Sequence, residues 1–186
     1  MPPESQEKPV MAILGDSLTS SFGPKNYSYL LAGQLGYRVH NAGIFGSSVS
    51  QTAGWDSGLL RVSTDINVFK PDIAVVFMGT NDLAHTVPLD VFRSNYAALL
   101  SRIQEESPST RIIAVGLLRR KDFSEQEIRS YSNAIRREAE ARNIAYIDPY
   151  AWLDSSDLQD VVHPSPQSQA KLADRMYQAL SPLILK

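Results

Sequence analysis

Short apolar runs alternate along this chain with segments in which apolar residues recur at helical spacing. Five runs are predicted to be strands, over residues 10–14, 37–40, 73–78, 111–116 and 144–147. The third run, Ile73 to Met78, is apolar at every position, which is typical of a strand buried on both faces in a parallel sheet. The pattern therefore predicts a sheet that is covered by helices on both sides.

The segments between the strands carry the signals of helices. Helices are predicted over residues 26–36, 54–69 (bent near 63), 89–106, 124–143 and 165–180. Asn26 is expected to cap the first of these helices, on which Tyr29, Leu30 and Leu35 are apolar, and Gly36 is expected to end it. In the fourth helix the spacing of a serine and a glutamate fits a capping box, formed by Ser124 and Glu127.

Strands and helices thus alternate through the chain. This order predicts an α/β fold: a three-layer α/β/α sandwich around a doubly wound parallel sheet of about five strands. No change of composition divides the chain, so residues 10–186 are expected to form one domain, preceded by a flexible tail at 1–9. In such sheets the active crevice lies beyond the carboxyl ends of the strands, so the residues that follow each strand are the informative ones.

Composition and charge narrow the function. Hydrophobic residues make up 43% of the 186 and charged residues 20%, with a net charge of −2. Nucleic acid is not an expected partner, because neutralising phosphates requires clustered Lys and Arg. The densest basic stretch, Arg119 to Lys121, is short and is followed by Asp122, so we interpret it as a solvated loop.

The chain has no cysteine, which excludes disulfides and thiolate chemistry. Its histidines, at 40, 85 and 163, show no spacing typical of a zinc site, so no metal is expected. No apolar run is long enough to cross a bilayer. The first nine residues do not form a signal peptide. The sequence as it stands predicts a cytoplasmic protein, or an exported one if a signal was removed before residue 1. The oligomeric state is left open.

Four polar clusters follow the predicted strands. They are Gly15-Asp16-Ser17-Leu18, the stretch 41–47, Gly79-Thr80-Asn81-Asp82 and the stretch 160–164. If the fold is right, all four converge on one rim of the sheet. Each alone has an ordinary reading, as a turn, a helix cap or a solvated loop. The Gly-Asp-Ser turn could also cradle a phosphate, or it could present a nucleophilic hydroxyl.

A serine nucleophile needs a base within hydrogen-bond reach, and the base needs an orienting partner. Ser17 lies in a tight turn, and His163 is held extended before Pro164. Asp160, three residues upstream, can accept the imidazole Nδ1–H and leave Nε2 to take the serine proton. The predicted catalytic residues are therefore Ser17, Asp160 and His163.

Acyl transfer also needs donors aimed at the developing oxyanion. The Ser17 backbone N–H, the Gly46 N–H and the Asn81 carboxamide are the candidates. Asp16 and Asp82 are expected to support the two turns by hydrogen bonds. Among the remaining polar and aromatic residues, His40 and His85 are expected to be structural or surface residues, Ser47, Ser48 and Thr80 to be supporting donors, and Phe22 and Trp55 to pack in the core.

These clusters resemble the SGNH, or GDSL, hydrolase family. Ser17 matches its serine within GDSLT, Gly46 its glycine within NAGIFG, Asn81 its asparagine within GTND, and His163 its histidine within DVVHP, with Asp160 as the acidic partner. The blocks occur in the family's order, from Leu14 to Pro164. The resemblance implies a flavodoxin-like sandwich and a serine esterase without metal or cofactor.

The resemblance leaves the substrate open. Arylesterases, lysophospholipases, thioesterases and carbohydrate deacetylases all belong to the family, so the expected partner is a small-molecule, lipid or carbohydrate ester. Because no long insertion supplies a lid, short acyl groups are favoured. An O-acyltransferase would use the same residues. A flavin- or phosphate-binding module is a weaker alternative, since no Walker or Gly-x-Gly-x-x-Gly pattern occurs. A non-catalytic binding domain is opposed by the intact nucleophile, base and donors.

Overall fold

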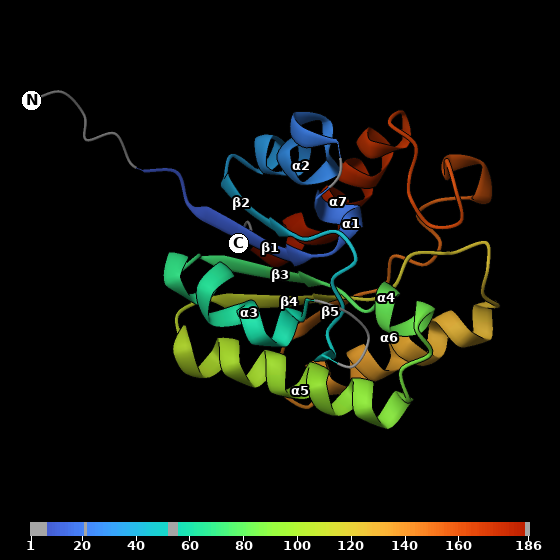
Figure 1. The fold of residues 1–186 in the computed structure, drawn as a ribbon. Helices are drawn as coiled ribbons and strands as arrows, with labels where there is room; N and C mark the ends of the chain where they lie inside the picture. The colour runs from blue at the N-terminus through green and yellow to red at the C-terminus, as the bar shows by residue number, and fades with distance from the viewer. Residues whose placement is uncertain (1–6, 21, 52–55, 185–186) are drawn as a thin grey trace, which may run out of the picture.

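The computed structural model describes residues 7–20, 22–51 and 56–184, and its centre is a five-stranded parallel sheet (Figure 1). The strands, in the order β2-β1-β3-β4-β5 across the sheet, are β1 (Val10–Gly15), β2 (Arg38–Gly43), β3 (Ile73–Phe77), β4 (Arg111–Val115) and β5 (Ala145–Ile147). All four pairings are parallel. The strand order reverses direction between β1 and β3, so the crevice expected at this switch point lies at the carboxyl end of β1.

Helices cover both faces of the sheet. Figure 1 shows α2 (Tyr27–Leu35) and α7 (Ser168–Ile184) on one face, and α3 (Gly58–Asp65), α5 (Leu89–Glu106) and α6 (Glu125–Glu140) on the other. Shorter elements join them: α1 (Ser17–Ser20), α4 (Thr80–Ala84), and the 3-10 turns η1 (Gly23–Lys25), η3 (Asn67–Phe69) and η4 (Ser155–Asp157). The predicted α/β/α sandwich with a parallel sheet is therefore confirmed.

Alternating residues of the central strands feed two separate cores. Ala74 and Val76 of β3 pack toward α3, α5 and α6, whereas Ile73, Val75 and Phe77 pack toward α2 and α7. Every residue of β3 is buried, as its unbroken apolar run predicts. Burial on both faces fixes the register of the central strands and thereby the positions of the loops at their carboxyl ends.

Two predicted elements differ in their limits. β2 extends to Gly43 instead of ending at His40, because Asn41 to Gly43 continue the parallel pairing with Ile13 to Gly15. Polar residues are tolerated there because β2 is an edge strand. The helix predicted over 54–69 begins only at Gly58, whose N–H bonds the Ser48 carbonyl, and it breaks at Ile66 rather than near residue 63. Residues 54 and 55 lie outside the described part of the chain.

The predicted helix caps are confirmed more fully than the predicted buried faces. The Asn26 side chain accepts the Ser28 N–H, Gly36 ends α2 in the left-handed region, and the capping box at the start of α6 is present. The expected apolar face of α2 is confirmed at Leu35 and wrong at its other two positions, however. Tyr29 and Leu30 are exposed, and α2 buries Tyr27, Leu31, Ala32 and Leu35.

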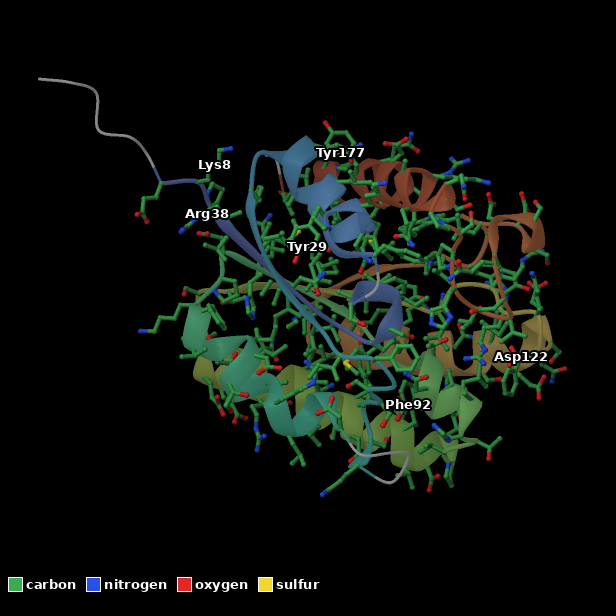
Figure 2. The ribbon with its side chains drawn as sticks, turned by 45° about the horizontal axis from the view of Figure 1, so that its top comes forward. Lys8, Tyr29, Arg38, Phe92, Asp122 and Tyr177 are labelled. Atoms are coloured by element: carbon green, nitrogen blue, oxygen red, sulfur yellow. The ribbon has the colours of Figure 1, made fainter. Side chains whose placement is uncertain are left out.

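The two ends of the sheet differ in what they carry. Figure 2 shows Lys8 and Arg38 together at the end where β1 and β2 begin, and Asp122 at the opposite end, toward which the strands run. At that end the Lys121 N–H bonds the carbonyl of Val161, so the loop after β4 lies against the loop between β5 and α7. Within the described residues, no helix combines the length and the hydropathy needed to cross a bilayer.

Candidate active site

The turn after β1 places Ser17 at the first position of α1. The side chain of Asp16 accepts the Leu18 N–H at 2.9 Å, and its carbonyl accepts the N–H groups of Thr19 and Ser20, so Asp16 acts as the N-cap of α1. The turn is tight enough that a Cβ at Gly15 would lie 2.1 Å from Thr19 Oγ1. Only glycine fits there, which explains the Gly-Asp-Ser order at the end of this strand.

The hydroxyl of Ser17 lies at one end of a chain of two hydrogen bonds. Ser17 Oγ is 2.8 Å from His163 Nε2, and His163 Nδ1 is 2.7 Å from Asp160 Oδ2. The three residues that the sequence nominates as nucleophile, base and orienting acid are thus brought into line. With Nδ1 donating to the carboxylate, Nε2 is the nitrogen left to accept the serine proton.

Asp160 is held as a carboxylate by its own loop. Its Oδ1 accepts the N–H groups of Val162 and His163 at 2.8 and 2.7 Å. Partial burial raises the pKa of Asp160, but these two bonds, the His163 ring bond and the charge of His163 outweigh burial and leave the pKa below its usual range. Asp160 therefore stays ionised, which is the state that orients a neutral imidazole and stabilises an imidazolium.

The loop that carries these two residues is fastened mainly by main-chain bonds. The Gln159 N–H donates to the His163 carbonyl, and the Ser165 N–H donates to the Asp157 carbonyl. From the neighbouring loop, the Lys121 ammonium donates to the Leu158 carbonyl at 3.0 Å. These contacts explain how an irregular segment can present an imidazole in one orientation.

The loop after β2 forms a tight turn beside the imidazole. The Ser47 N–H donates to the Ile44 carbonyl at 3.1 Å, and Gly46, at the third position of the turn, has φ 74°. A positive φ at this position is what a type II turn requires, and glycine adopts it freely. A Cβ at Gly46 would meet no atom within 4 Å, so the space in front of this backbone is open to a substrate.

Asn81 and Asp82 tie the loop after β3 to the loop after β2. Asn81 Nδ2 donates to the Ser47 carbonyl at 2.7 Å, which leaves its second amide hydrogen for another acceptor. The fully buried Asp82 accepts the N–H groups of Val49 and Ser50 at 2.8 and 3.0 Å. Burial raises the pKa of Asp82, and the two backbone bonds oppose that rise. The expected supporting function of Asp82 thus has a structural basis.

A buried arginine that is not among the predicted site residues hydrogen-bonds the same part of the molecule from α3. Arg61 on α3 donates to the carbonyls of Gly15 and Ala42 and to Ser47 Oγ, at 2.9, 2.7 and 3.0 Å. Its charge is balanced by Asp56 at 2.8 Å and Asp65 at 2.9 Å. The sequence signal for a buried arginine was the pair of acidic residues around it, Asp56 five positions before and Asp65 four positions after.

Arg120 corrects the prediction that Arg119 to Lys121 form a solvated loop. The Arg120 side chain is buried, forms two hydrogen bonds to Asp122 at 2.9 and 2.7 Å, and donates to the Thr80 carbonyl at 3.0 Å. A neighbouring carboxylate and a carbonyl at the start of α4 provide the partners that burial of the guanidinium requires. Arg120 therefore braces the residue that precedes Asn81.

Asp16 is the most strongly perturbed carboxyl at this end of the sheet. Burial raises its pKa to about 7, against the lowering effects of the Leu18 N–H, His163 and Arg120. Its Oδ2 is buried and has no hydrogen-bond partner. Asp16 organises the turn, as expected, through Oδ1 and its main-chain carbonyl.

The other nominated residues lie outside this hydrogen-bonded chain. His40 stacks on Phe69 at 3.7 Å between ring centroids, and His85 is exposed at the end of α4. Phe22 is half-buried rather than part of the core, and Trp55 lies outside the described residues. Within the described ranges, no three His, Asp or Glu side chains are grouped to hold a metal ion, so no residue can be named as a ligand.

The hydrogen bond from Ser17 to His163 can carry the serine proton to the imidazole, which acyl transfer through a serine requires. Comparison with known proteins points the same way. Residues 13–171 match the GDSL-like lipase/acylhydrolase family. The chain belongs to this family, and it is a serine hydrolase that acts on ester bonds.

Individual relatives are distant in sequence but similar over their whole length. Esterase TesA of Pseudomonas aeruginosa is 22% identical, over 94% of this chain and 89% of that protein. An arylesterase of Vibrio mimicus is 22% identical, over 95% and 90%. The crystal structure of the psychrotrophic esterase EstA from Pseudoalteromonas, inhibited by monoethylphosphonate, superposes with a TM-score of 0.79 at 19% identity, covering 95% of this chain and 99% of that one. At this identity the superposition shows the fold alone.

Proposed function

We propose that this protein hydrolyses carboxylic esters through an acyl-enzyme on Ser17, with His163 as general base and acid and Asp160 as its orienting partner. The observation that carries the proposal is the continuous chain from Ser17 Oγ to His163 Nε2 at 2.8 Å and from His163 Nδ1 to Asp160 at 2.7 Å. An unactivated serine is a weak nucleophile, and a base at this distance removes that weakness.

In the first half of the reaction, Ser17 Oγ attacks the ester carbonyl while its proton passes to His163 Nε2. The carbonyl oxygen becomes an oxyanion that accepts hydrogen bonds from the N–H groups of Ser17 and Gly46 and from the Asn81 carboxamide. The intermediate then collapses, the bond to the leaving oxygen breaks, and His163 gives its proton to that oxygen to release the alcohol.

In the second half, water takes the place of the alcohol. His163 removes a proton from the water, whose oxygen attacks the acyl carbonyl and re-forms the oxyanion in the same place. Collapse of this intermediate breaks the bond to Ser17 Oγ, which recovers its proton from His163, and the carboxylic acid leaves. Asp160 remains ionised throughout, consistent with its lowered pKa.

The favoured substrates are esters of small or short acyl groups. The relatives named above are an esterase and an arylesterase, which supports simple esters over large lipids. The space beside Gly46 is open. A site of this kind gives long acyl chains little apolar surface to bind, so turnover should fall as the acyl chain lengthens.

Labelling with an ethyl phosphonate reagent tests the nucleophile. The reagent should form a single adduct on Ser17, located by peptide mass mapping, and should abolish hydrolysis of p-nitrophenyl acetate in proportion to labelling. Ser17→Ala should take up no label, while Ser20→Ala, three residues away on the same short helix, should label like the native protein. An adduct on any other residue would overturn the assignment.

A p-nitrophenyl ester series from acetate to decanoate tests the acyl preference. Activity should be greatest on the shortest members and should decline steadily above about six carbons. A rise toward decanoate would contradict the proposed substrate class without affecting the assignment of Ser17, because the leaving group is the same in every member.

A further inference from the structure

The loop after β2 exposes an aromatic ring directly beside the imidazole of His163. Phe45 is 73% exposed, the largest value among the exposed large apolar side chains of the described residues. Its ring lies 6.2 Å from the His163 ring, centroid to centroid, with only 10° between the two planes. An exposed phenylalanine alone needs no explanation, but this one is parallel to the ring that is proposed to move the proton.

Two further apolar side chains are exposed in the same two loops. Ile44 precedes Phe45 and is 39% exposed, and Val161, two residues before His163, is 45% exposed. Other apolar residues of these loops, such as Val49 and Val162, are buried. We call Ile44, Phe45 and Val161 the apolar rim. Hydrophobic side chains left in water around a polar centre are typical of a surface that becomes buried when a ligand binds.

The turn that carries Phe45 is fixed before any ligand arrives. The Ser47 N–H bonds the Ile44 carbonyl, Arg61 donates to Ser47 Oγ at 3.0 Å, and Asn81 donates to the Ser47 carbonyl at 2.7 Å. Phe45 therefore stands at the second position of a turn held on three sides. A main chain fixed in advance needs no ordering when a ligand binds, which favours the use of this turn as a contact surface.

The chemistry of the proposed reaction decides which part of an ester meets this ring. His163 Nε2 must give its proton to the leaving oxygen, so that oxygen lies at the edge of the imidazole. The group attached to that oxygen then extends beside the imidazole, on whose flank the ring of Phe45 lies 6.2 Å away. The acyl carbon is bonded to Ser17 Oγ instead, and its chain extends from the far side of the oxyanion.

We propose that the apolar rim, with Phe45 as its centre, is a subsite for an aromatic leaving group, so that the preferred substrates are esters of aromatic alcohols or phenols. The inference rests on the proposed function, because it uses the proton transfer from His163 to place the alcohol. A flat ring stacked on Phe45 gains both apolar burial and the favourable geometry of aromatic pairs.

Three esters separate the possible contributions of Phe45. Benzyl acetate carries a ring on the alcohol, methyl phenylacetate carries it on the acyl group, and methyl acetate carries none. The two acetates release alcohols of similar acidity, so their intrinsic reactivity is comparable. Phe45→Ala should lower kcat/KM for benzyl acetate about tenfold, mainly through KM, and should change it less than twofold for the other two esters.

Two control variants keep the comparison interpretable. Phe45→Tyr retains the ring and should behave like the native protein on all three esters. Val68→Ala removes a side chain that is similarly exposed, at 65%, on η3 at the other end of β3, and should change nothing. Because Phe45 is exposed, the urea midpoint of Phe45→Ala should match that of the native protein, so a lost activity cannot be assigned to unfolding.

Other outcomes would overturn the inference in distinct ways. Equal losses on all three esters would mean that Phe45 merely supports His163, and a loss confined to methyl phenylacetate would place the ring on the acyl side. Failure of the native protein to hydrolyse any of the three, together with no phosphonate adduct on Ser17, would refute the proposed function itself. An adduct on Ser17 with no preference for benzyl acetate would refute only the subsite.

Discussion

The two sides of the candidate site are built differently. Ser17, Gly46 and Asn81 follow strands β1, β2 and β3. Two buried charged side chains, Arg61 and Asp82, hydrogen-bond the segments that carry them. Asp160 and His163 belong to an irregular loop in which the Asp160 side chain is 47% exposed and the bonds are mostly between near neighbours. We call these the strand-end side and the base loop.

The difference teaches where stability and activity are coupled. On the strand-end side, the groups proposed to bind the oxyanion share partners with the interior of the fold, so removing a brace there disturbs both. In the base loop, Asp160 and His163 hydrogen-bond one another, Ser17 and their own loop, so these side chains can be changed at small cost in stability. Four predictions test this contrast, from the largest expected effect to the smallest.

The largest effect is expected from His163→Ala in the base loop. Without a base for Ser17, kcat on p-nitrophenyl acetate should fall about 10⁴-fold or more. The free energy of unfolding, from urea denaturation, should change by less than about 0.5 kcal/mol, as for other substitutions away from the core. A destabilisation as large as that of a core variant would show that the base loop is not the independent unit described here.

Asn81→Ala should be the next largest, and on the strand-end side both quantities should change. Loss of one oxyanion donor should lower kcat by about 10² to 10³. Loss of the bond to the Ser47 carbonyl should also reduce stability by about 1 kcal/mol. Steady-state kinetics and urea denaturation on the same sample measure the two effects. A kcat within threefold of the native value would mean that Asn81 does not bind the oxyanion.

Arg61→Met tests the brace of the strand-end side. Removing the guanidinium leaves the Gly15 and Ala42 carbonyls and two carboxylates without their partner, so the free energy of unfolding should fall by about 3 kcal/mol. The control is Arg129→Met, which breaks exposed ion pairs with Glu125 and Asp148 and should cause no measurable change. Similar urea midpoints for the two variants would contradict a bracing role for Arg61.

The smallest effect concerns the pH dependence that Asp16 introduces. Its pKa is about 7 in the folded protein against a reference value of 3.8, so the folded state binds the proton more tightly. Between these values the native protein should lose stability as the pH rises. Asp16→Asn, which cannot ionise, should lack this loss, and its stability relative to the native protein should improve by about 2 kcal/mol from pH 5 to pH 8.

Urea denaturation at a series of pH values measures the effect. The contribution of Asp160 has the opposite sign, because its pKa is lowered by folding, and it is present in both proteins, so it cancels in the difference. A difference between the two proteins that does not vary with pH would show that Asp16 is ionised throughout, despite its burial.

Much of this structure could be predicted from local patterns. Three features follow from the residues themselves: the buried strand β3, the helix caps at Asn26 and Ser124, and the glycine that ends β1. Propensity, capping and sterics act over a few positions, so neighbouring residues are enough to predict them. The exposed Tyr29 and Leu30 on α2 and the buried Arg120 could not be predicted in this way. Which face of a helix meets the sheet, and whether an arginine finds a carbonyl to bond, depend on residues distant in sequence.

The sequence by itself determined the succession of strands and helices along the chain and the kinds of chemical group that follow each strand. Both depend on neighbouring residues. Tertiary structure alone decided that Ser17 and His163, 146 residues apart, meet at 2.8 Å, and that Arg61 and Asp82 lie between the loops. The physical reason is that a contact between distant segments depends on how the whole sheet is assembled. No local pattern of apolar and polar residues specifies that assembly.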